Sequence, residues 1–178
     1  MRILTVIFPE FEETEFAAPV DIFRRAGLDV TVASLTDNKL VVGRSDIKVE
    51  ADKTIKEVNP DDFDFLFIPG GPGIKAVRKN TDLVKFVAKF AQSGKYVAAI
   101  CAAPLILLDA GLLKNCKFTA HFSTKSELPN SITDQKVVQD GKIITSQGAG
   151  TAIELGLHIV KVLCGEQKAY EIAKAIMY

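Results

Sequence analysis

The chain has 178 residues, of which 48% are hydrophobic and 25% are charged, and its 22 basic side chains balance its 22 acidic ones. This length predicts a single domain over residues 1–178, and the apolar content excludes intrinsic disorder as the main state. Nucleic acids and anionic membranes attract proteins with a surplus of basic residues. A net charge of zero therefore disfavours both as partners.

The longest apolar run, Tyr96 to Leu108, contains Pro104 and is shorter than the roughly 20 residues that a transmembrane helix needs. The first apolar stretch ends at Pro9 and a group of glutamates rather than at a leader-peptide cleavage site, so we expect a cytoplasmic protein. The chain contains three cysteines: Cys101, Cys116 and Cys164. None of them belongs to a CxxC motif, so we expect free thiols, no disulfide framework and no metal site.

Short apolar stretches alternate with longer stretches of helical period, which is typical of βαβ units on a mostly parallel sheet. The predicted strands are Arg2–Phe8, Asp29–Leu35, Asp64–Ile68, Lys95–Ile100, Lys117–Thr119 and Lys142–Thr145. The predicted helices are Glu13–Ala26, Asp82–Gln92, Ala102–Ala110, Gly150–Leu163 and Glu166–Ile176. Hairpins are predicted for Leu40–Val42 with Ile47–Val49 and for Val137–Gln139 with Lys142–Thr145. The strands are apolar on successive residues, as a sheet covered by helices on both faces requires, so we predict a three-layer α/β sandwich.

Cys101 lies directly between a predicted strand and a predicted helix. Ligands of open parallel sheets bind at such strand ends. The unpaired N–H groups and the positive dipole end of a helix start favour a thiolate, so we expect a lowered pKa for Cys101. Small neighbours such as Ala99 and Ala102 are what a tight turn around a nucleophile needs. Cysteine is also often buried, so the local sequence leaves two interpretations open, a reactive thiol or a space-filling side chain.

The loop Ile-Pro-Gly-Gly-Pro-Gly, residues 68–73, follows a strongly apolar strand. Its glycines let the backbone approach a ligand and offer amide donors. With Ala76 it imitates a dinucleotide-binding fingerprint, but the next predicted strand is followed by Cys101 and not by the acidic residue that would hold a ribose. We therefore expect no nicotinamide site, and the loop is either an oxyanion-binding loop beside Cys101 or a plain turn.

The loop after the first strand carries four glutamates: Glu10, Glu12, Glu13 and Glu15. This cluster would repel phosphate and disfavours nucleotide and flavin mononucleotide cofactors. Glu15 precedes Phe16 and two alanines, which places it where the helix faces the protein interior. Burial near a thiolate raises the pKa of a carboxyl, so Glu15 is either a protonated partner of Cys101 or a surface acid of the first helical turn.

The two histidines lie in different settings. His121 follows the predicted strand Lys117–Thr119 on the side of the sheet where the other candidates gather. It can serve Cys101 as a catalytic partner if the ring lies within reach of the sulfur, which the sequence does not show. His158 lies inside a predicted helix between apolar neighbours, so we interpret it as structural.

Four segments together resemble the ThiJ/PfpI superfamily, specifically its parkinsonism-associated deglycase (DJ-one) branch. They are Glu-Glu-Thr-Glu-Phe-Ala-Ala-Pro-Val-Asp-Ile-Phe-Arg-Arg-Ala-Gly (12–27), Ile-Pro-Gly-Gly (68–71), Ala-Ala-Ile-Cys-Ala-Ala-Pro (98–104) and Ile-Thr-Ser-Gln-Gly-Ala-Gly-Thr (144–151). The resemblance implies a flavodoxin-like sandwich, usually a homodimer, with an oxidation-prone cysteine at a nucleophile elbow and no cofactor.

The resemblance also implies roles for individual residues. Cys101 matches the nucleophile, and Glu15 matches a protonated carboxyl hydrogen-bonded to it. His121 matches the histidine near the cysteine. The oxyanion pocket would be formed by Gly70, Gly71 and the N–H of Ala102, and the arginines near the family's anion site would correspond to Arg25 and Arg44.

Two functions are compatible with these residues. The first is a cysteine-dependent, cofactor-independent glyoxalase/deglycase-type enzyme that acts on methylglyoxal-like dicarbonyls or their early thiol and amine adducts and protects against oxidative stress. The second is a redox-sensing protective protein or chaperone in which Cys101 is oxidised to a sulfinate. The PfpI protease branch has a histidine directly after its cysteine, whereas Ala102 stands here, so we expect no peptidase triad of that kind.

Overall fold

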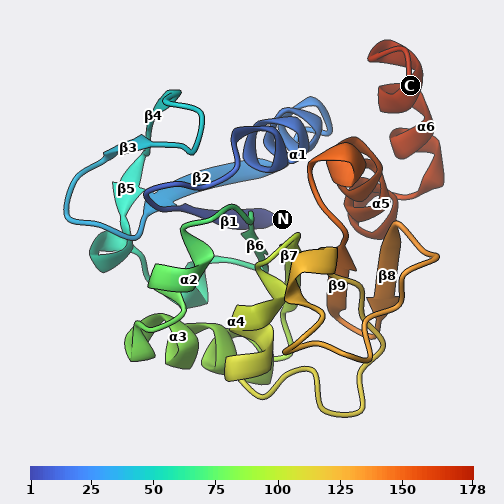
Figure 1. Ribbon diagram of the computed structural model, residues 1–178. Coiled ribbons are helices and arrows are strands. Elements are labelled where there is room, and N and C mark those ends of the chain that lie inside the picture. Colours follow the sequence, from blue (N-terminus) through green and yellow to red (C-terminus); the bar gives the residue numbers. More distant parts are fainter.

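The computed structural model describes residues 1–178 and contains a seven-stranded sheet between two layers of helices (Figure 1). The strand order is β5-β2-β1-β6-β7-β9-β8. The bounds are β1 Arg2–Ile7, β2 Asp29–Ser34, β5 Lys53–Thr54, β6 Phe65–Ile68, β7 Tyr96–Ile100, β8 Val137–Asp140 and β9 Ile143–Ser146. All neighbouring strands are parallel except the hairpin β8–β9. The predicted mostly parallel α/β fold is confirmed.

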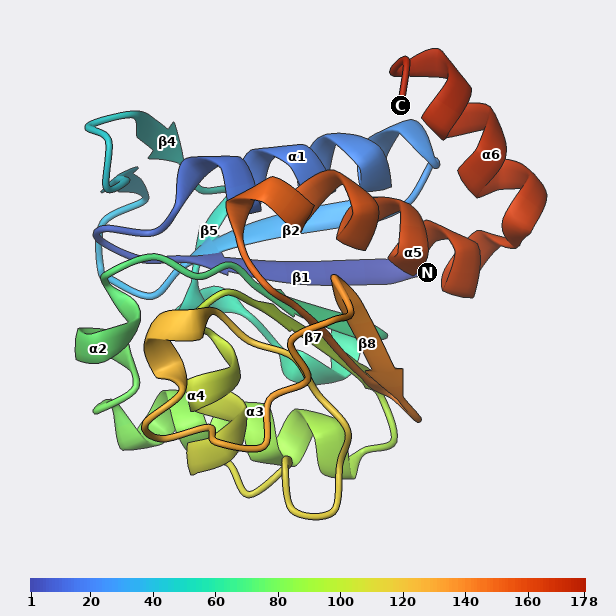
Figure 2. The same cartoon turned by 45° about the vertical axis from the view of Figure 1, so that its right-hand side comes forward.

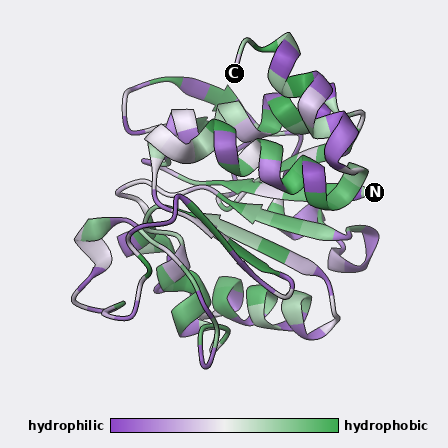
Figure 3. Cartoon of the chain, turned by 90° about the vertical axis from the view of Figure 1, so that its right-hand side faces the viewer, coloured by the Kyte–Doolittle hydropathy of each residue, from purple (hydrophilic) through white to green (hydrophobic).

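The central strands form the middle layer of the hydrophobic core. All four residues of β6 are buried, and in β1 and β7 only the first residue is not. Both faces of these strands are apolar because helices cover both, and the hydrophobic residues concentrate on the strands and on the inward helix faces (Figure 3). Parallel pairing in register, for example Leu66 opposite Val97, brings the carboxyl ends of the strands to one edge.

The helices divide into two layers (Figure 2). One face of the sheet carries α1 and α5, with α6 packed beyond α5, and the other carries α2, α3 and α4. Where α5 meets α1, a Cβ on Gly156 would lie only 2.8 Å from the Cδ1 of Ile22, so glycine permits the close approach. The bounds are α1 Glu13–Arg25, α2 Ile74–Val77, α3 Thr81–Gln92, α4 Pro104–Asp109, α5 Ala152–Cys164 and α6 Glu166–Ala175.

One predicted strand is wrong. Lys117–Thr119 forms no strand, because side chains rather than a neighbouring strand take up its backbone donors. The N–H of Lys117 donates to the carboxylate of Asp140 at 2.8 Å, and the N–H of Thr119 donates to the hydroxyl of Thr145 at 2.9 Å. The segment therefore rests against the β8–β9 hairpin without extending the sheet.

Other boundaries move by a few residues. In the first predicted hairpin, the second strand is Lys48–Glu50 (β4) rather than Ile47–Val49. It pairs with β3 (Leu40–Val42) in a separate two-stranded sheet. The fourth helix starts at Pro104 rather than at Ala102, because proline fits the first position of a helix. The short elements β5 and α2 were not predicted. None of the helices combines the length and apolar character that crossing a membrane demands.

Candidate active site

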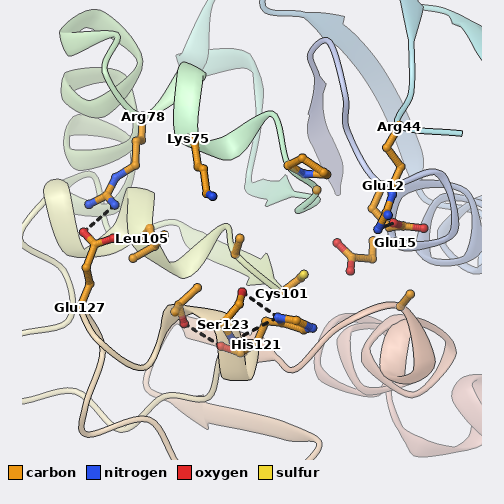
Figure 4. Close-up of a pocket in the computed structure, with 15 residues that line it drawn as sticks. Glu12, Glu15, Arg44, Lys75, Arg78, Cys101, Leu105, His121, Ser123 and Glu127 are labelled. Carbon is orange, nitrogen blue, oxygen red and sulfur yellow. Dashed lines mark hydrogen bonds and ion pairs between the residues drawn. The ribbon is translucent and has the colours of Figure 1, made fainter. Parts of the chain in front are cut away.

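Loops from the carboxyl ends of the strands surround a cavity of about 370 Å³ (Figure 4). Most of the predicted site residues line it, namely Glu15, Arg44, Gly71, Cys101, Ala102 and His121. Segments far apart in the sequence therefore meet at one place, as expected for an open parallel sheet. No three histidine, cysteine or carboxylate side chains gather in a way that could hold a metal ion.

Cys101 occupies the turn between β7 and α4, in the left-handed region with φ of 64°. This backbone conformation costs about 1 kcal/mol or more for a residue with a side chain, and such strain often occurs at functional sites. Two hydrogen bonds hold it: the N–H of Cys101 donates to the carbonyl of Ser146, and its carbonyl accepts from the N–H of His121, both at 2.9 Å. The predicted strand-to-helix turn at this cysteine is confirmed.

Glu15 is the buried acid of the site. Only 1% of it is exposed, and its Oε2 accepts a hydrogen bond of 2.9 Å from the N–H of Gly70. Burial raises the pKa of Glu15 to about 7, although hydrogen bonds from Cys101 and Gly70 act in the opposite direction. A Cβ on Gly70 would lie 2.6 Å from Glu15 Oε2 and 2.7 Å from Cys101 Cβ. Glycine is therefore required for the acid and the thiol to meet.

The expectation of a lowered pKa for Cys101 is wrong for the structure as it stands. Burial and the adjacent carboxyl of Glu15 raise the pKa of this thiol to about 12, and the backbone N–H groups of Ala102 and Gly71 offset only part of this. The helix dipole is weak here because α4 is short and starts only at Pro104. A second negative charge would lie beside the first in a desolvated pocket, so the pair holds at most one negative charge near neutral pH.

Two of the three predicted oxyanion donors face the sulfur. The N–H groups of Gly71 and Ala102 favour the anionic form of Cys101 by hydrogen bonding. The N–H of Gly70 does not belong to this set, because it is taken up by Glu15. At Gly71 φ is +114°, and a Cβ there would collide with the backbone of the loop that bears Glu10 and Glu12. This glycine turns successive amides toward different partners.

His121 lines the same cavity as Cys101 (Figure 4). Its Nδ1 lies 2.8 Å from the hydroxyl of Ser123 and accepts the backbone N–H of the same residue at 3.3 Å. A ring nitrogen that accepts an N–H carries no proton, so the neutral ring bears its proton on Nε2. The ring packs closely over Gly148, where a Cβ would lie 3.4 Å from Cδ2. The His121 ring is therefore fixed in orientation beside the cavity.

The two predicted anion-binding arginines lie in different places. Arg44 lines the cavity, with its Nη1 3.1 Å from Glu12 Oε2. Arg25 lies outside it and forms an exposed ion pair with Asp21 at 2.6 Å. Arg25 is the last residue of α1, and ten residues at about 1.5 Å each put it roughly 15 Å along the helix from Glu15. Within this chain Arg25 does not reach the cavity, and its role in anion binding stays a prediction.

A family model described as the DJ-1/PfpI family matches residues 1–162. The chain belongs to the DJ-1/PfpI family. It is 37% identical to Protein dj-1beta of Drosophila melanogaster over 98% of this chain and 95% of that protein. It is 35% identical to Deglycase PfpI of Pyrococcus furiosus over 92% of this chain and 99% of that protein.

Solved structures agree with this assignment to the DJ-1/PfpI family. The crystal structure of Drosophila melanogaster DJ-1beta superposes with a TM-score of 0.94 at 36% identity, covering 99% of this chain and 97% of the other. A structure of oxidized Toxoplasma gondii DJ-1 gives a TM-score of 0.93 at 32% identity, covering 99% and 98%. The flavodoxin-like sandwich that the sequence resemblance implies is confirmed.

Several polar residues of this DJ-1/PfpI cavity were missed from the sequence: Lys75, Arg78, Ser123 and Glu127. Lys75 and Arg78 come from α2 and its C-terminal end, a single helical turn too short to give a periodic pattern. Arg78 joins separate segments, since it donates to Asp109 and to Glu127 at 2.7 Å. For Lys75 and Arg78, the one sequence feature that could have indicated a place in the site was their position directly after the glycine loop.

Proposed function

We propose that this DJ-1/PfpI protein is a cysteine-dependent, cofactor-independent enzyme that converts methylglyoxal-like dicarbonyls, or their early thiol and amine adducts, to hydroxy acids. The observation that carries this proposal is the hydrogen-bonded contact between the carboxyl of Glu15 and the thiol of Cys101, which is possible because Gly70 has no side chain between them. Enzymatic activity is supported by relatives named deglycases from Pyrococcus furiosus and Pyrococcus abyssi, which are 35% and 34% identical to this chain.

In the proposed first step, the sulfur of Cys101 attacks the aldehyde carbon while the thiol proton passes to Glu15. A carboxylate whose pKa is about 7 is well matched to this exchange at neutral pH. The N–H groups of Gly71 and Ala102 stabilise the oxyanion that forms. Glu15 then returns the proton to that oxygen, which gives a hemithioacetal and regenerates the carboxylate.

The second step moves hydrogen within the substrate. Glu15 removes the hydrogen on the sulfur-bearing carbon as a proton, while the Nε2–H of His121 polarises the neighbouring ketone. Reprotonation of the former ketone carbon reduces it to an alcohol and leaves the other carbon oxidised as a thioester. Water cleaves the thioester, releases lactate and restores the thiol of Cys101. The net reaction adds one water and needs no external oxidant or reductant.

Lactate formation tests this proposal. The protein is incubated with methylglyoxal in buffer free of thiols and amines, with Cys101→Ala and the matched control Cys116→Ala beside the wild type. We expect lactate from the wild type and the control and none above background from Cys101→Ala, because only Cys101 lies in the cavity. Equal yields from all three proteins would contradict the proposal.

Selective oxidation of Cys101 is the competing function. Peroxide reacts with the thiolate, and the proposed enzyme uses the same sulfur as its nucleophile, so the raised pKa of Cys101 does not separate the two functions. Mass spectrometry after mild peroxide treatment distinguishes the two. A sensor would accumulate sulfinate at Cys101 ahead of Cys116 and Cys164, whereas an enzyme without this role shows no such preference.

The homodimer remains a proposal that rests on the family resemblance. Sedimentation at micromolar concentration checks it, with twice the chain mass of 19.3 kDa expected. A species of one chain mass would contradict it.

A further inference from the structure

Three basic side chains reach the cavity, and two of them are neutralised. Arg44 pairs with Glu12 at 3.1 Å. Arg78 pairs with Asp109 and with Glu127, both at 2.7 Å. The side chain of the third, Lys75, makes no hydrogen bond or ion pair with any residue. Lys75 is therefore the one cation of the cavity that has no direct partner.

Lys75 lies on the first turn after the glycine loop, and Figure 4 shows its ammonium group pointing into the cavity from α2. Cys101 and Glu15 lie deeper in the same cavity and together carry at most one negative charge near neutral pH. A molecule whose carbonyl reaches Cys101 therefore has space for a second group directed at Lys75. The cavity of about 370 Å³ is at the small end of ordinary ligand sites but far larger than methylglyoxal.

We propose that Lys75 binds a carboxylate of the substrate, so that this site prefers α-oxoaldehydes bearing a carboxylate over neutral ones such as methylglyoxal. The inference rests on the proposed function. A singly charged carboxylate fits better than a phosphate, because a single lysine faces it and the acids of the lining, Glu12, Glu15 and Glu127, repel a dianion about twice as strongly as a monoanion. Lys75 acts on binding and approach rather than on the reacting atoms, so it is a specificity residue.

Alkylation of Cys101 tests the charge preference without any turnover. Iodoacetate and iodoacetamide have nearly the same shape and differ by one negative charge. Their rates are measured by mass spectrometry in a Cys116→Ser, Cys164→Ser background, and the ratio of the two rates is the readout. This ratio cancels any change in the thiolate fraction, since both reagents attack the same sulfur.

The variants are Lys75→Gln, Lys75→Arg and the matched control Lys79→Gln. Lys79 is also exposed and unpaired and lies one turn further along the chain, but it does not line the cavity of Cys101. We expect Lys75→Gln to lower the iodoacetate-to-iodoacetamide ratio by about threefold to tenfold, a range typical of one partly screened charge. Lys75→Arg and Lys79→Gln should keep the ratio of the parent. Equal ratios in the parent and Lys75→Gln, or equal drops in both glutamine variants, would overturn the inference.

A kinetic comparison adds the substrate. Phenylglyoxal and 4-carboxyphenylglyoxal differ by a carboxylate placed away from the reacting carbonyl. We expect Lys75→Gln to raise KM for the carboxylated compound by a similar factor, with kcat and the constants for phenylglyoxal unchanged. A lower kcat for both compounds would contradict a specificity role. Absence of turnover with a preserved alkylation effect would reject the proposed enzyme and leave anion binding at Lys75 supported.

Discussion

The two ends of α1 match the same family motif and have opposite fates. Glu15 in the first turn is 1% exposed, bonded to Gly70 and shifted to a pKa of about 7. Arg25 in the last turn is exposed and pairs only with Asp21, one turn away on the same helix. The difference comes from the chain segments that approach each end. The glycine loop and the Cys101 turn cover Glu15 at the first turn of the helix, whereas Arg25 at the last turn is exposed to solvent.

The largest expected effect is on turnover at the buried end. Glu15→Gln removes the proposed base and should reduce the rate of lactate formation by about a hundredfold to ten-thousandfold. The same variant removes the negative charge that raises the pKa of Cys101, so labelling by iodoacetamide at pH 7 should become faster. Steady-state kinetics and labelling rates measure the two effects. Unchanged turnover, or labelling that slows, would show that Glu15 does not have this role.

A stability effect follows from the same carboxyl. Its pKa is raised from 4.5 to about 7 in the folded protein, so folding favours the protonated form. The contribution of protonated Glu15 to the free energy of unfolding is therefore fully present below pH 4.5 and is lost as the pH rises through about 7. A shift of this size corresponds to a loss of about 3 kcal/mol in the free energy of unfolding.

Urea unfolding between pH 4.5 and 8 measures this loss in the wild type, in Glu15→Gln and in Arg25→Gln. We expect Glu15→Gln to abolish this component of the pH dependence because it cannot ionise. Arg25→Gln, at the other end of α1, should retain it. Parallel curves for the wild type and Glu15→Gln would mean that the buried carboxyl does not govern stability in this range.

A smaller effect is expected where the glycine loop meets Glu15. Gly70→Ala places a methyl group 2.6 Å from Glu15 Oε2, so one of the groups must move. Overpacking of this kind costs about 1 to 3 kcal/mol and should also separate the acid from the thiol. Gly150→Ala is the matched control, because a Cβ at that glycine has no atom within 4 Å. Thermal unfolding compares the two variants, and equal stabilities would refute the tight fit.

The smallest effect is expected at the exposed end. Arg25→Gln breaks only the pair with Asp21, whose two side chains are 48% and 55% exposed. Pairs of this kind contribute about 0.5 kcal/mol or less. Chemical unfolding and lactate formation should both stay close to the wild type. A large loss of activity would mean that Arg25 reaches a site through a second copy of the chain. Both ends of α1 would then serve the active site.

The sequence by itself determined the layered fold and the elements that bear the site. Buried parallel strands are apolar on successive residues and helices have a period of 3.6, so most strands and the long helices were predictable. Cys101, Glu15 and the glycine loop were predictable as well, because each follows a strand and therefore lies at the same sheet edge. Short elements carry no period, which is why α2 and its Lys75 were missed.

Only the tertiary structure decided the chemistry of these residues. The direction of each amide, the burial of Glu15 and the raised pKa of Cys101 depend on contacts between segments that are distant in the sequence. The same reason explains the failure at Lys117–Thr119, where the side chains of Asp140 and Thr145 replaced a strand partner. Local pattern fixes the backbone, whereas desolvation and hydrogen bonding depend on everything that packs around a group.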